Sequence, residues 1–204
     1  MAYSDFNLAK VQKSFNLTLD ETRNLFTDIE PIAPSETLKA LLIDYIPLAT
    51  SIATEKARSE FLIAPILADL RRLLKNKVSL FSGNEFNVES TKGLQGFCDY
   101  ILSFSQEQLF ISAPVMFIFE AKKEDINGGL GQCVAAMIAA QLFNQVQENE
   151  VERIYGSVTT GTNWKFLFIE GTTVYIDSIE YYIKEVDKIF GILLQPFQPI
   201  LTII

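Results

Sequence analysis

The chain has 204 residues, of which 49% are hydrophobic, and this composition suits one globular domain with a sizeable core. It contains no histidine, which excludes histidine-based acid–base catalysis and disfavours a zinc site. The formal net charge of −8 argues against a broad nonspecific attraction to nucleic acid.

The sequence also carries signals about the compartment. The sequence contains no run of about 18 apolar residues, so it does not predict a membrane span. Residues 1–15 also lack the apolar run of a signal peptide. Cys98 and Cys133 lie in apolar segments, without metal-ligand spacing and without a disulfide framework. We therefore expect a cytoplasmic protein with no membrane partner.

The chain shows no internal repeat, no low-complexity tract and no linker long enough to divide it. We expect a single domain over residues 1–204, in which residues 1–50 form a mainly helical N-terminal extension. Thr18 or Asp20 is suited to cap a short helix over residues 21–26.

Two further helices are predicted before the first strand. Ser35 is a good N-cap for a helix that should end near Pro47, because the residue before a proline disfavours the helical conformation. Residues 54–76 carry apolar side chains at helical spacing. Pro65 lacks a backbone N–H, so we expect this helix to be kinked or broken near Phe61.

Three strand-like runs follow these helices. Residues 82–84 predict a turn, and the alternation over residues 85–89 predicts a half-buried strand. A second strand is expected over residues 94–104, and Pro114 opens a third, at a position where a strand tolerates proline.

The rest of the chain predicts an alanine-rich helix, three strands, an amphipathic helix and an apolar tail, in that order. These elements cover residues 130–146, 153–159, 165–169, 173–176, 179–193 and 195–204. The tail suits either a sheet edge or a partner, and a homodimer is one such arrangement.

Two acids and a lysine stand out in the strand region. Asp99 lies within a β-prone run, Glu120 ends the next run, and Lys122 follows two residues later. Side chains alternate along a strand, so Glu120 and Lys122 should share a face while Ala121 points the other way. A charge at the end of a buried strand is costly unless it is paired or bound to a cation. Two converging carboxylates beside an amine could hold a hard divalent cation and help to deprotonate a water.

At these residues the chain resembles the PD-(D/E)XK nuclease superfamily, the restriction-endonuclease-like fold, as a bacterial-type member. The family motif is an Asp on one strand and Glu-x-Lys on the next. Asp99 matches the first part, and Glu120-Ala121-Lys122 matches the second, 21 residues on. Cys98 stands where the family usually has a proline before the Asp.

Two more positions extend the resemblance, which covers roughly residues 54–170. The family often carries a Glu on the helix before the first core strand, and Glu60 matches it. Many members carry a Gln on the helix after the Lys, and Gln132 matches it. The resemblance implies an α/β fold with an αβββαβ core, in which helices flank a central mixed sheet.

The function that the resemblance implies is metal-dependent hydrolysis of phosphodiester bonds, with DNA as the nucleic-acid partner. The cofactor would be Mg²⁺ or Mn²⁺, held by Asp99, Glu120, the main-chain carbonyl of Ala121 and Glu60. Lys122 would orient or deprotonate the attacking water, and Gln132 would orient water or a phosphate.

Other interpretations stay open. One is a non-catalytic nuclease-fold binding or regulatory module, which the acidic composition favours. Another is a structural network of ion pairs, in which Glu60 is an exposed helix partner of Lys56. The basic residues Arg71, Arg72, Lys75 and Lys77 could line a nucleic-acid groove or form a solvated helix end.

Overall fold

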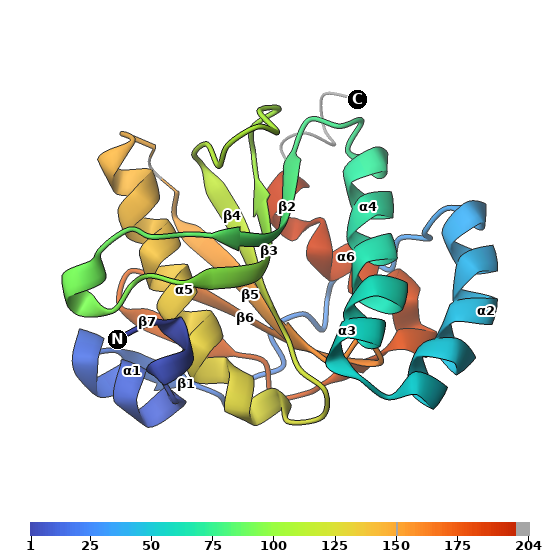
Figure 1. The fold of residues 1–204 in the computed structure, drawn as a ribbon, viewed down its shortest axis with the longest axis horizontal. Coiled ribbons are helices and arrows are strands. Elements are labelled where there is room, and N and C mark those ends of the chain that lie inside the picture. Colours follow the sequence, from blue (N-terminus) through green and yellow to red (C-terminus); the bar gives the residue numbers. More distant parts are fainter. Residues whose placement is uncertain (150, 199–204) are drawn as a thin grey trace.

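A computed structural model describes residues 1–149 and 151–198. The protein is α/β, with an eight-stranded mixed sheet in the order β1-β7-β6-β5-β4-β3-β2 and with β8 paired to β6 (Figure 1). The strands are Thr18–Asp20 (β1), Ser79–Glu85 (β2), Phe97–Ser103 (β3), Val115–Ala121 (β4), Arg153–Thr159 (β5), Asn163–Glu170 (β6), Thr173–Ile176 (β7) and Tyr181–Tyr182 (β8). The α-helices are Leu8–Phe15 (α1), Glu36–Ile52 (α2), Glu55–Arg58 (α3), Ala64–Leu73 (α4), Ile126–Val146 (α5) and Val186–Leu193 (α6).

The strand connections divide the sheet into two parts. β2, β3 and β4 form an antiparallel meander, and α5 then crosses over so that β5 pairs parallel to β4. β5, β6 and β7 are antiparallel, and β1 closes the far edge parallel to β7. The sheet is therefore mixed, as expected.

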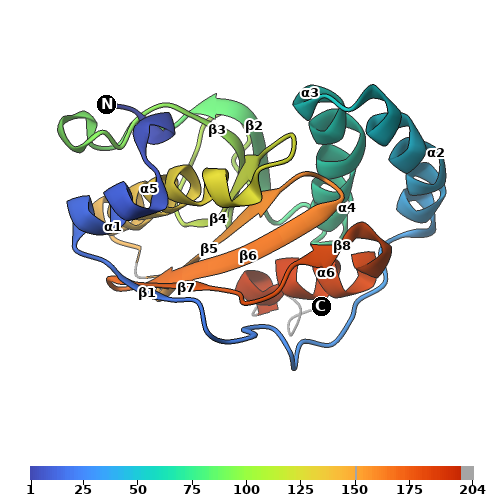
Figure 2. The same ribbon diagram turned by 90° about the horizontal axis from the view of Figure 1, so that it is seen from below.

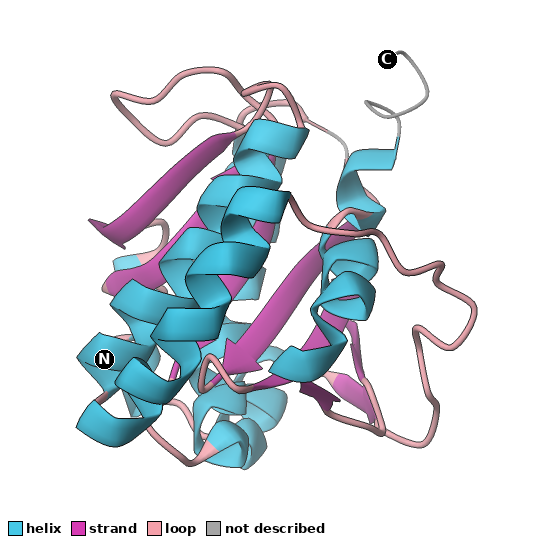
Figure 3. Ribbon diagram, turned by 90° about the vertical axis from the view of Figure 1, so that its right-hand side faces the viewer, coloured by secondary structure: helices cyan, strands magenta, loops and turns pink. Residues whose placement is uncertain are grey.

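Helices cover both faces of the sheet. α1 and α5 lie on one face, whereas α2, α4 and α6 lie on the other (Figures 2 and 3). β4 serves both cores, because Ile118 packs into the cluster of the α5 face while Phe117 and Phe119 pack into the opposite cluster. α1 lies close to α5 because Gly131 has no side chain, and a Cβ there would lie 2.2 Å from the carbonyl carbon of Asn7.

Two expectations for the N-terminal region are wrong. Residues 21–26 form bends and turns rather than a helix, since Thr18–Asp20 add to the sheet beside β7 and the chain leaves that edge through a turn. α2 continues through Pro47 to Ile52. Pro47 has no N–H to donate to the carbonyl of Ile43, four residues earlier in the helix. Because Ile43 is exposed, water can donate to this carbonyl instead, and the helix continues.

The predicted break near Phe61 is confirmed by a π-helical segment, Ser59–Ile63, between α3 and α4. The turn expected at residues 82–84 is wrong, because these residues lie within β2, whose pairing with β3 overrides their local turn preference. Gly83, with a φ of 67°, supplies the irregular backbone there. The strand expected over residues 85–89 is also wrong, because β2 ends at Glu85 and residues 86–89 lie beyond it.

The later elements agree better with expectation. The strands over residues 153–159 and 173–176 are confirmed, and the strand over residues 165–169 is the centre of β6. The last helix is shorter than expected, because Tyr181–Tyr182 pair with β6 before α6 begins. Residues 195–197 of the tail form a 3₁₀ turn, and residues 199–204 lie outside the described residues.

α5 begins at Ile126, earlier than expected, because the Asp125 side chain accepts a 2.9 Å hydrogen bond from Gly128 N–H and caps it. By length and composition alone this helix could cross a membrane. However, 67% of its most apolar window is buried inside the protein, as in the core helix of a soluble protein.

Candidate active site

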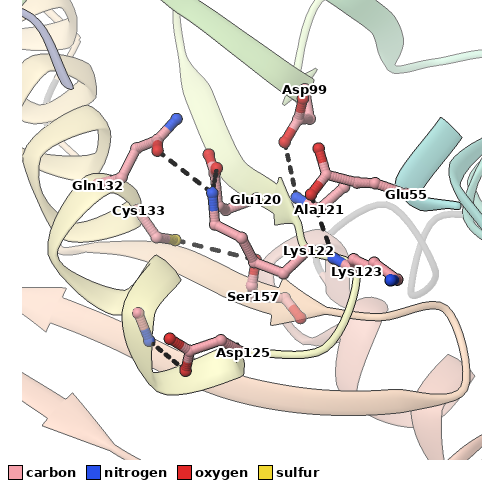
Figure 4. Close-up of polar contacts among 11 residues, drawn as sticks. Glu55, Asp99, Glu120, Ala121, Lys122, Lys123, Asp125, Gln132, Cys133 and Ser157 are labelled. Carbon is pink, nitrogen blue, oxygen red and sulfur yellow. Dashed lines mark hydrogen bonds and ion pairs between the residues drawn. The ribbon is translucent and has the colours of Figure 1, made fainter. Parts of the chain in front are cut away.

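The predicted site residues other than Glu60 lie around the C-terminal end of β4, close to the start of β3 and the first turns of α5 (Figure 4). The register pairs Tyr100 with Phe119 and so places Asp99 across from Glu120 on the neighbouring antiparallel strand. Adjacent strands were expected for these two acids, and the structure places them so.

Asp99 is held against the backbone of β4. Its Oδ2 accepts a 2.7 Å hydrogen bond from Ala121 N–H. Lys122 N–H donates to the carbonyl of Thr159 on β5 at 2.9 Å. The C=O and N–H of a trans peptide point in opposite directions, so the Ala121 carbonyl points away from β5, toward the side of Asp99.

Glu120 is 4% exposed and faces α5. Its Oε1 lies 2.6 Å from Lys122 Nζ, so the two side chains share a face as predicted. Burial, together with the nearby charge of Asp99, raises the pKa of Glu120 to about 8, although Lys122 opposes this shift. Burial also raises the pKa of Asp99 above its usual value, and the hydrogen bond from Ala121 N–H opposes that shift.

Lys122 runs along the first turns of α5. Its Nζ donates to Oε1 of Gln132, the predicted helix glutamine, in a long hydrogen bond of 3.4 Å. Gly129 leaves room for the Lys122 side chain, because a Cβ at position 129 would lie 3.0 Å from Lys122 Cε and 2.7 Å from Val158 Cγ1. Burial lowers the pKa of Lys122, but the neighbouring Glu120 outweighs it, so the pKa is raised and the amine carries its positive charge.

The structure does not bring Glu60 into contact with these acids. Glu60 lies 2.8 Å from Lys56 in an ion pair whose side chains are 55% and 81% exposed, respectively. The helix carboxylate at the site is Glu55, whose Oε2 accepts a 3.1 Å hydrogen bond from Lys123 N–H. Its charge helps to raise the pKa of both Asp99 and Glu120.

Glu55 was missed because the family resemblance assigned the helix acid to Glu60. A local signal was present, since Thr54 is a capping residue whose side chain accepts from Ala57 N–H at 3.1 Å. That cap marks the helix end nearest the site, and Glu55 is the first residue after it.

A shallow hollow of about 270 Å³ opens beside Asp99 and Ala121. Glu55 and Glu60 both line it, whereas Glu120 is not among the described residues of its wall. The hydroxyl of Tyr100 shares a 2.6 Å hydrogen bond with Ser59 Oγ and so ties the π-helical segment to β3. The hollow therefore exposes Asp99, while Glu120 lies buried next to Lys122.

The oxygen atoms around the end of β4 are the candidate ligands for a cation. Among the residues that the structure describes, no group of three or more His, Cys, Asp and Glu side chains is gathered as a metal site. Asp99, Glu120 and Glu55 each use one carboxylate oxygen in a contact with the protein. The second oxygen of each accepts no hydrogen bond from the described residues. These carboxylate oxygens and the Ala121 carbonyl are of the type that a hard cation such as Mg²⁺ prefers.

The basic cluster lies elsewhere. Arg71 and Arg72 end α4, roughly 25 Å along the helical segment from Glu55. Arg71 Nε donates to the carbonyl of Val78 at 3.0 Å, and Arg72 pairs with Asp69 at 2.8 Å. These arginines therefore do not line the hollow beside Asp99.

Comparison with known proteins finds no relative, since no family model, no curated protein and no solved structure matches the chain. The chemistry of the protein has to be inferred from its own side chains. The residues around the end of β4 are the strongest basis for that inference, because they combine burial, opposite charges and a shifted acid pKa.

Proposed function

We propose that the protein is a metal-dependent nuclease of the PD-(D/E)XK type, which hydrolyses phosphodiester bonds, with DNA as the first substrate to test. The observation that carries the proposal is the placement of Asp99 across from Glu120 with Lys122 bonded to Glu120. The chain order supports it, because a helix, the β2–β3–β4 meander, α5 and a parallel β5 follow the order of an αβββαβ core.

In this proposal Asp99, Glu120 and the carbonyl of Ala121 hold Mg²⁺ or Mn²⁺, and Glu55 takes the helix position expected for Glu60. A bound cation of this kind lowers the pKa of a coordinated water and polarises the phosphate. The Lys122 amine stabilises negative charge that develops on the phosphate, in a partly buried position where charge interactions are strong.

The test is cleavage of single- and double-stranded DNA and RNA with Mg²⁺, with Mn²⁺ and with a chelator. Glu120→Gln and Lys122→Ala should abolish turnover, whereas the matched control Lys123→Ala should retain it, because the Lys123 side chain is exposed. Circular dichroism checks that each variant is folded. A folded wild-type protein with no metal-dependent turnover on any of these substrates contradicts the proposal.

Lys122→Ala also separates chemistry from folding. If Lys122 acts on the phosphate, the variant should bind Mn²⁺ in calorimetry about as well as the wild type while it fails to cleave. A variant that does not fold would indicate that the pair with Glu120 is structural, since removal of one partner leaves a buried charge.

A second candidate is a non-catalytic nuclease-fold binding module. Two observations favour it. Both acids already have partners within the protein, since Glu120 pairs with Lys122 and Asp99 accepts from Ala121 N–H. In addition, Arg71 and Arg72 lie far from the site. Nucleic-acid binding to duplex DNA should show a log–log salt slope of about −0.9 for each phosphate contacted. A protein-binding module would show neither that salt dependence nor turnover.

A further inference from the structure

The loop between β3 and β4 carries two adjacent apolar side chains at its tip, and both are exposed to solvent. Leu109 is 93% exposed and Phe110 is 62% exposed. A single exposed apolar residue is ordinary, whereas adjacent large ones form a contiguous apolar patch, which is the kind of surface that interaction sites use.

Hydrogen bonds hold this loop tip in place. The Gln108 side chain bonds the backbone of β2 twice, because its Nε2 donates to the Leu80 carbonyl at 2.7 Å and its Oε1 accepts from Leu80 N–H at 3.2 Å. Glu107 Oε1 accepts from Leu109 N–H at 2.8 Å. The loop thus presents Leu109 and Phe110 from a fixed base, which lowers the ordering cost of binding through them.

A basic turn lies beside the loop tip. Lys75 and Lys77 connect α4 to β2, and the bonds between Gln108 and Leu80 bring the loop next to the strand that this turn begins (Figure 1). Neither lysine forms an ion pair within residues 1–149 and 151–198. Part of the densest basic cluster of an acidic chain therefore flanks an exposed apolar pair.

We infer that this end of the protein docks onto an anionic phospholipid bilayer. The docking surface consists of Leu109, Phe110, Lys75 and Lys77, with Arg72 at its edge. The apolar pair would enter the boundary between headgroups and acyl chains, while the lysines would attract anionic headgroups.

A nucleic acid would also attract the lysines and could stack on Phe110, but it offers Leu109 no apolar layer in which to be buried. The combination of Leu109 with the basic turn therefore favours lipid. This contact is peripheral and needs no spanning helix, so it revises the expectation of no membrane partner. It is independent of the nuclease proposal.

The experiment is co-sedimentation of the full chain with vesicles of phosphatidylcholine, with and without phosphatidylserine. We expect binding to the anionic vesicles only. Lys75→Glu/Lys77→Glu should weaken it about tenfold or more, because each basic residue near an anionic surface contributes about fivefold to the affinity. Leu109→Ser/Phe110→Ser should abolish it, and both variants should fold because the altered side chains are not part of the core.

Matched controls place the same changes elsewhere. Lys13→Glu/Lys92→Glu alters net charge equally on exposed residues at the other end of the protein, and Ile43→Ser removes an exposed apolar side chain from α2. Both controls should bind like the wild type. A Phe110→Trp variant gives a second measurement, because its emission should shift to the blue on anionic vesicles.

Several results would overturn the inference. These are no binding to anionic vesicles, equal binding to neutral vesicles, or equal losses in the control variants. Lipid-independent binding of DNA or RNA that requires the same four residues would assign the surface to nucleic acid instead.

Discussion

Two buried carboxylates, Asp69 on α4 and Glu120 on β4, have opposite electrostatic environments. Asp69, 8% exposed, accepts from Ser35 N–H at 2.9 Å, from Ser35 Oγ at 2.7 Å and from the Arg72 guanidinium at 2.8 Å. Burial raises the pKa of Asp69, but these donors outweigh it and hold the pKa below its usual value. Glu120 has only Lys122 as a donor and Asp99 as a neighbour, and its pKa is raised to about 8.

The difference in hydrogen-bond donors indicates different roles for Asp69 and Glu120. The donors around Asp69 fully satisfy its ionised form, so this residue ties the start of α2 to α4 and stabilises the fold. Glu120 has fewer donors and lies beside a second acid, and such a perturbed buried acid is more typical of functional sites than of structural ones.

The largest predicted contrast is in cleavage. Under the proposed function, Glu120→Gln should lower metal-dependent turnover by about a thousandfold or more, because it removes a charge that would hold the cation. Asp69→Asn should change the rate constant of the folded enzyme less than twofold. Single-turnover assays at a temperature where both variants are folded measure this contrast, and equal losses in the two variants would contradict it.

The second contrast is in stability. Asp69→Asn should lower the free energy of unfolding by about 2 kcal/mol at neutral pH, because charge-assisted hydrogen bonds are lost. The folded pKa of Asp69 lies below 3.8, so its stabilisation is present above that pH and is lost as the pH falls through the folded pKa. Urea titrations of variant and wild type should therefore converge in acid, and a constant difference would count against this role.

Glu120 should show the opposite pH dependence. Its folded pKa of about 8 lies above the usual 4.5, so the folded state retains a proton that the unfolded state releases between these values. Without divalent cations, the wild type should lose stability relative to Glu120→Gln as the pH rises through this window. Melting curves with a chelator test this, and a difference independent of pH would show that Lys122 already compensates the charge.

The smallest effect is expected for the exposed acid on the same helical segment. Glu60→Gln should cost no more than about 0.5 kcal/mol of stability, because its pair with Lys56 is exposed to solvent. It should leave cleavage unchanged, whereas Glu55→Gln should slow cleavage about tenfold by removing a charge next to Asp99. The reverse ranking in a rate comparison would restore Glu60 as the site acid.

Local patterns predicted many of the elements well. The apolar alternation of β5 and β7 and the cap at Ser35 depend on neighbouring residues, and the structure confirms them. The strand β1 and the extent of β2 were not predictable in this way, because β1 exists only through pairing with β7 and β2 through pairing with β3. Propensity at residues 21–26 and 82–84 favoured other structures, and distant strands decided the outcome.

Residues close together in the chain suffice to place Glu120 and Lys122 on one face, because side chains alternate along a strand. The family resemblance added Asp99 on the neighbouring strand, and tertiary packing selects the helix acid that lies beside them. Glu55 accepts a hydrogen bond from Lys123 N–H just beyond the end of β4, whereas Glu60, five residues later, pairs with Lys56 in solvent. The tertiary structure likewise carried the basic turn away from the site and set it beside Leu109 and Phe110, since contacts between Gln108 and Leu80 span 28 residues.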